Sequence, residues 1–89
     1  MESIKRLDQA INLARSIASD LWCYNKAKVK DGVRNEDLYE RLQKEIGEGA
    51  RWYRERVSTE LDPTGEHFER ALIDVLLYRA MRSLSEETQ

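Results

Sequence analysis

A histidine and two carboxylates near residue 66 are the first side chains in this chain whose types could do chemistry. His67 is the sole histidine among 89 residues, with Glu66 and Glu69 beside it. A metal ion or a general acid needs several such groups on one face. At about 100° per residue along a helix, the two glutamates point to different sides from His67. The spacing therefore predicts a solvated histidine near a helix start, with no catalytic or metal-binding role.

A second carboxylate pair, Glu45-x-x-Glu48, could hold a divalent cation. This spacing resembles the ExxE motif with which all-helical nucleotide pyrophosphohydrolases hold magnesium, and that resemblance would imply a metal-dependent enzyme. However, the helical register places Glu48 on an outer face beside Lys44 and Arg51, whereas a metal site in a bundle needs inward carboxylates. No nucleophile motif or glycine-rich phosphate motif is present. The sequence predicts no enzyme activity, no metal and no cofactor.

The segment GEGARWYRER, residues 47–56, could be a phosphate-binding loop because glycines precede three arginines. Such a loop places its glycines after a strand and at a helix start. Here the apolar spacing continues through Gly49, which predicts a helix with a close-packing notch at that residue. Arg51, Arg54 and Arg56 remain possible nucleic-acid contacts, since a two-fold dimer could align them along phosphates. Acidic residues interleave them, so a small nucleic-acid-associated regulator is the alternative function.

The sequence leaves two interpretations open for each of two further side chains, Cys23 and Asp74. Cys23 is the only cysteine, which excludes an intrachain disulfide, and the register predicts a partly exposed thiol. A redox role would require basic neighbours that lower its pKa, and Lys26 is the obvious one. Asp74 lies in an apolar segment, so it either reaches the surface to pair with Arg70, which we favour, or is buried in an interface.

Three helices are expected to position these side chains. The first ends at the stop signal Asp31-Gly32. Its apolar residues recur in alternating steps of three and four: Ile4, Leu7, Ile11, Ala14, Ala18 and Leu21. The second starts with Asn35 as its N-cap, and its apolar stripe runs to Val57. The third extends from about Glu66 to about Leu84, capped by Asp62 or Thr64.

Composition agrees with an all-α protein. There is one proline, and 36% of the residues are charged, mostly helix-forming Glu, Arg and Lys. The 15 basic and 17 acidic residues give a net charge of −2, too little to attract nucleic acid or membrane by overall field. No segment approaches the length of a membrane span or resembles a secretion signal. We expect a cytoplasmic protein with one helical domain at residues 1–84 and a polar tail at 85–89.

The apolar surface of these helices exceeds what a small bundle can bury. The expected fold is a three-helix antiparallel bundle, a long hairpin plus a third buried helix, and residues 71–78 of that third helix are apolar almost all round. We therefore predict a dimer, with a homodimer expected and a heterodimer left open. The predicted interface residues are Leu13, Ile17, Tyr24, Trp52, Ile73, Leu77, Met81 and Leu84.

These predictions favour a small, non-enzymatic, self-associating interaction module that acts as an adaptor or regulator. Its remaining apolar or aromatic surface would dock a helix of a further protein partner. The identity of that partner is not encoded in any motif of the chain.

Overall fold

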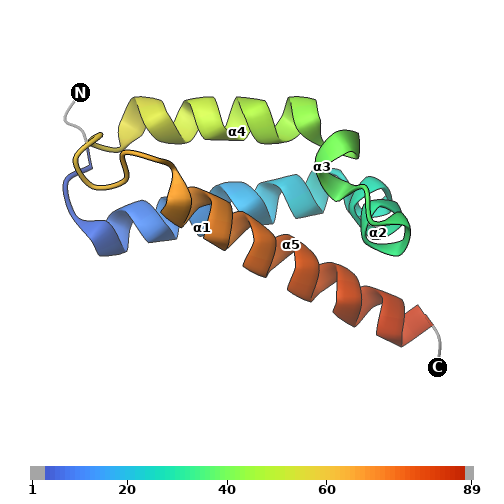
Figure 1. The fold of residues 1–89 in the computed structure, drawn as a ribbon. Coiled ribbons are helices and arrows are strands. Elements are labelled where there is room, and N and C mark those ends of the chain that lie inside the picture. Colours follow the sequence, from blue (N-terminus) through green and yellow to red (C-terminus); the bar gives the residue numbers. More distant parts are fainter. Residues whose placement is uncertain (1–3, 88–89) are drawn as a thin grey trace.

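The protein is all-helical over residues 4–87, the part of the chain that the computed structural model describes (Figure 1). Five helices follow in order: α1 Leu7–Tyr24, α2 Lys26–Asn35, α3 Leu38–Arg41, α4 Gln43–Arg56 and α5 Glu66–Glu87. Within residues 4–87, the one strand-like feature is a bridge between Ile4 and Val57, which holds the N-terminal segment against the end of α4. The predicted all-α class is confirmed.

Helix α1 is the central element of the fold. Both α4 and α5 pack along it, and α5 makes the more extensive contact. Figure 1 shows α4 and α5 diverging from the turn that joins them, with α2 and α3 at the far end. The molecule is elongated, measuring 46 × 22 × 19 Å. This arrangement leaves one side of α5 without a helical neighbour.

The first helix expected from the sequence is broken at Asn25. Its backbone leaves the helical region at φ −134°, and its side-chain amide donates a hydrogen bond to the carbonyl of Leu21 at 3.0 Å. Asparagine readily makes such local bonds in place of helical ones. The chain therefore turns here and begins the separate helix α2.

The helix stop predicted at Asp31-Gly32 is wrong, and so is the N-cap predicted at Asn35. Helix α2 continues through Gly32 and ends at Asn35, and Glu36 takes the left-handed conformation at φ 57°. Gly32 is needed for packing instead: a Cβ there would lie 2.7 Å from the Cα of Leu38. The glycine lets α3 cross closely over α2, which a side chain would prevent.

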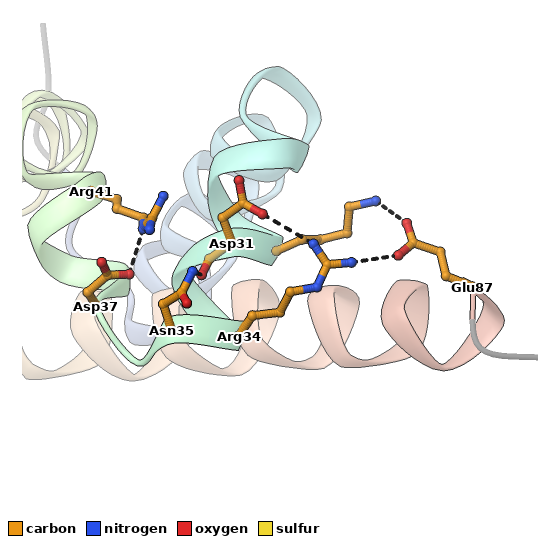
Figure 2. Close-up of polar contacts among 7 residues, drawn as sticks. Asp31, Arg34, Asn35, Asp37, Arg41 and Glu87 are labelled. Atoms are coloured by element: carbon orange, nitrogen blue, oxygen red, sulfur yellow. Dashed lines mark hydrogen bonds and ion pairs between the residues drawn. The ribbon is translucent and has the colours of Figure 1, made fainter.

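The second expected helix is also divided. The four-residue helix α3 is separated from α4 by Leu42, whose backbone is non-helical at φ −107° and whose side chain is fully buried. Arg41 and Asp37 form an ion pair across α3 at 2.6 Å (Figure 2). Burial of Leu42 holds the chain in place where the two helices change direction.

The core lies between α1, α4 and α5. Gly49 of α4 meets Ile17 of α1 there, and a Cβ on Gly49 would lie 2.9 Å from the Cγ2 of Ile17. The close-packing notch predicted at Gly49 is confirmed. The buried apolar residues are Ala10, Ala14, Ile17, Ala18, Trp22, Val29, Leu42, Tyr53, Val57, Phe68, Ala71, Leu72, Val75, Leu76 and Ala80.

Helix α5 extends three residues beyond its predicted end at Leu84 and reaches Glu87. Figure 2 shows Arg34 lying between Asp31 of its own helix and Glu87 of α5, at 3.2 and 2.9 Å. Lys30 also pairs with Glu87. Three residues of the expected polar tail are therefore helical, and the other two, 88 and 89, lie outside the described residues.

Candidate functional site

One apolar line on α5 faces away from the core. Ile73, Leu77 and Met81 are 41%, 39% and 57% exposed, and their spacing of four residues places them on one face of the helix. We call these three side chains the α5 ridge. Leu84 continues the line and is half-buried. The opposite side of α5 already contributes to the core through residues such as Leu72 and Leu76.

A groove of about 510 Å³ runs beside the α5 ridge, between α5 and the α2–α3 corner. We call it the α3–α5 groove. Ile73 and Leu77 form one wall, and Leu38 and Tyr39 stand opposite them. Tyr39 is 46% exposed, and its pKa is raised by burial and by the negative charge of Glu69. Glu36, Asp37 and Glu40 also line the groove, so an acidic edge borders the apolar surface that the groove shares with the ridge.

A second depression, the α1–α4 groove, lies between α1 and α4. Tyr24 of α1 and Trp52 of α4, both predicted interface residues, line this same groove of about 270 Å³. They are 85% and 44% exposed. The structure thus places on one surface two aromatic side chains that are 28 positions apart in the sequence.

Two predicted interface residues contribute mainly to the core. Ile17 is 4% exposed and packs against Gly49, so it is not available to a partner. Leu13 is partly buried against the same core. Position on the helical wheel predicted their apolar environment, but α4 of the same chain covers this side of α1.

The three candidate nucleic-acid contacts are not brought together. Arg51 pairs with Glu55 at 3.4 Å, and the guanidinium of Arg56 lies 4.6 Å from the ring centroid of Trp52. Arg54 instead lines a cavity between α4 and α5. At about 100° per residue these arginines leave the helix in three directions, so they form no single phosphate-binding stripe.

Within residues 4–87, the most buried acidic residue is Asp62, in the connection between α4 and α5. The hydroxyl of Tyr53 donates to it at 2.8 Å, and the backbone N–H groups of His67 and Phe68 donate at 3.2 and 3.3 Å. Burial acts to raise the pKa of Asp62, but these hydrogen bonds outweigh burial and lower it. The pKa of Tyr53 is raised, first by burial and then by its bond to Asp62.

Asp62 therefore has a structural role, joining α4 to the start of α5. The sequence predicts it as one of two possible caps, and the structure assigns that role to Asp62. The sequence did not predict the hydrogen bond that Asp62 accepts from Tyr53. An Asp before Pro63 signals the cap, but no local pattern indicates a tyrosine nine positions away as its partner.

The remaining candidate side chains are Cys23, Asp74 and Glu45. Cys23 is exposed, as its register predicted. Asp74 is exposed as well, and no ion pair joins it to Arg70 within residues 4–87. Glu45 pairs with Lys28 at 3.2 Å. In the part of the chain that the structure describes, no three His, Cys, Asp or Glu side chains are arranged to hold a metal ion.

No known protein family, curated protein or solved structure matches this chain. Across residues 4–87, none of the helices combines the length and apolar character needed to cross a membrane. Function must therefore be inferred from the surfaces of the chain itself.

Proposed function

We propose that this chain is a small cytoplasmic, non-enzymatic interaction module that forms a homodimer through the α5 ridge. One observation carries the proposal. Ile73, Leu77 and Met81 are each about two-fifths exposed or more, in one line on a helix whose other side is already packed. Contiguous exposed apolar patches of this kind mark association sites more often than isolated apolar residues do.

A second copy of the chain is the occupant that this ridge fits. In a two-fold dimer the same surface meets itself, so two α5 helices would lie antiparallel with Leu77 at the axis and Ile73 facing Met81. Helix α5 has 22 residues and is about 33 Å long, which provides a long contact line. The neighbouring α3–α5 groove would receive side chains from the second copy and enlarge the contact toward the ~800 Å² per partner of stable interfaces.

Such a dimer would leave the α1–α4 groove free, because that groove is lined by residues of α1, α4 and the α1–α2 junction and by none of α5. The chain would then act as an adaptor, with one surface for self-association and another for a protein partner. We do not propose the alternative function of nucleic-acid binding, since two of its three candidate arginines already contact Glu55 and Trp52.

Light scattering coupled to size exclusion tests the dimer. We expect the native chain at twice its mass of 10.5 kDa, and Leu77→Asp at the mass of one chain, because a charge would be buried at the axis. Tyr24→Asp is the matched control, since Tyr24 is 85% exposed but lies outside the ridge. A native chain that remains monomeric at all concentrations, or a control that dissociates equally, would contradict the proposal.

A further inference from the structure

The α1–α4 groove carries negative charge on both of its walls. Asp20 projects from α1, and Glu45 and Glu48 project from α4, while no lysine or arginine among residues 4–87 lines the groove. Its remaining surface is apolar or aromatic apart from Asn25. An apolar channel with carboxylates on both sides suits an occupant that has an apolar stem and a cationic end.

Glu45 has hydrogen-bonding capacity that the chain leaves unused. Its Oε1 accepts a bond from Lys28 at 3.2 Å, and its Oε2 is buried and accepts no hydrogen bond from another residue among those described. The pKa of Glu45 is lowered, first by a hydrogen bond from its own backbone N–H and then by Lys28, so the carboxylate is charged. Its Oε2 keeps a lone pair for a donor that enters along the groove.

The aromatic residues add a preference for a planar cation. Trp52 already has the guanidinium of Arg56 over its ring at 4.6 Å, so its surroundings tolerate that group, and Arg56 is not among the residues that line the groove. Guanidinium stacks on aromatic faces and binds carboxylates through a rigid fork of donors. An ammonium group has neither property.

We propose that the α1–α4 groove binds an arginine side chain of a protein partner. The volume of about 270 Å³ lies below the ~300–1,000 Å³ of small-molecule pockets, which suits a single long side chain. The stem of the arginine lies over Leu21 and Tyr24, and its guanidinium lies between Asp20 and the carboxylates of α4. This site uses none of the α5 ridge, so it can fail or succeed independently of the proposed dimer.

The test is a nuclear magnetic resonance titration of the ¹⁵N-labelled chain with N-acetyl-arginine-N-methylamide. We expect the indole N–H of Trp52 and the amide of Gly49 to shift. The citrulline analogue has nearly the same shape but no charge, and it should bind about tenfold more weakly because it loses charged hydrogen bonds. The lysine analogue should also bind more weakly than the arginine one.

Matched variants assign the effect to the groove. Glu48→Gln removes one charge from the groove wall and should weaken arginine binding by about threefold. Glu60→Gln removes one charge from an exposed position in the α4–α5 connection and should leave binding unchanged. The proposal is overturned if excess arginine probe leaves Trp52 and Gly49 unshifted, if citrulline or lysine binds as well as arginine, or if Glu60→Gln weakens binding as much as Glu48→Gln. The mass of each variant, measured separately, reports on the dimer.

Discussion

Replacing Asp62 with alanine should lower the free energy of unfolding by about 3 kcal/mol. The variant leaves the hydroxyl of Tyr53 without an acceptor in a residue that is 2% exposed, which costs ~1–3 kcal/mol. It also removes the acceptor for the N–H groups of His67 and Phe68, and loss of a helix cap costs ~1 kcal/mol. These two contributions add to the stated value.

Tyr53→Phe isolates one part of this cost. It removes a single hydrogen bond to a charged acceptor and should destabilise the chain by about 1.5 kcal/mol. In the double variant no hydroxyl is left unsatisfied, so its cost should be less than the sum of the two single variants, with a coupling of ~1–2 kcal/mol. Additive costs would contradict the direct bond between these side chains.

Acid provides an independent measure of the same interaction. Because folding lowers the pKa of Asp62, its stabilisation is complete above the unfolded pKa of about 3.9 and is lost as the pH falls through the lower folded value. The difference in stability between the native chain and Asp62→Ala should be constant near pH 7 and should shrink below about pH 4. A difference that persists to the lowest pH would show that the carboxylate charge is irrelevant.

Urea unfolding followed by circular dichroism provides these values. All variants are compared at one protein concentration, because self-association shifts apparent stability. Thr64→Ala is the control, since Thr64 is the other predicted cap and is exposed, and it should change stability by less than about 0.5 kcal/mol. If Thr64→Ala costs more than Asp62→Ala, the assignment of the cap is wrong.

Three further predictions concern backbone and thiol positions. Gly49→Ala should destabilise the chain by ~1–3 kcal/mol because its Cβ would lie 2.9 Å from Ile17. Gly47→Ala, with open space around it, should instead stabilise the chain by up to ~1 kcal/mol. Equal urea midpoints for the two variants would contradict this pair of predictions. Glu36→Gly should stabilise by ~1 kcal/mol since it relieves the left-handed conformation at φ 57°, and a lower melting temperature would refute that reasoning. Cys23, being exposed, should react with one equivalent of a thiol reagent in the native chain, and a reaction that requires denaturant would show otherwise.

Helical periodicity predicted much of this fold because it depends on neighbours three and four residues apart. It placed Gly49 in a packed stripe, and the register also placed Cys23 at the surface. It also identified the line Ile73, Leu77 and Met81 as apolar surface that one chain does not fully cover. These features follow from local spacing alone.

Periodicity did not predict where the helices break or which helix covers each apolar face. Asn25 interrupts a helix where its side chain bonds to the carbonyl of the preceding turn, and Leu42 interrupts one where its side chain is completely buried. Gly32 carries the usual signature of a helix stop, yet its lack of a side chain serves contact with Leu38. Ile17 was assigned to a partner surface because periodicity identifies an apolar face without identifying the helix that covers it.

The proposed dimer makes one geometric claim that crosslinking tests most directly. With Leu77 at the two-fold axis, Leu77→Cys in a Cys23→Ser background places two thiols of the pair within disulfide reach, about 4–7 Å between Cα atoms. We expect rapid formation of a covalent dimer under mild oxidation, and no more than slow, concentration-dependent crosslinking for Tyr24→Cys in the same background. Equal rates for the two variants, or a monomeric Leu77→Cys chain after oxidation, would contradict self-association through the α5 ridge.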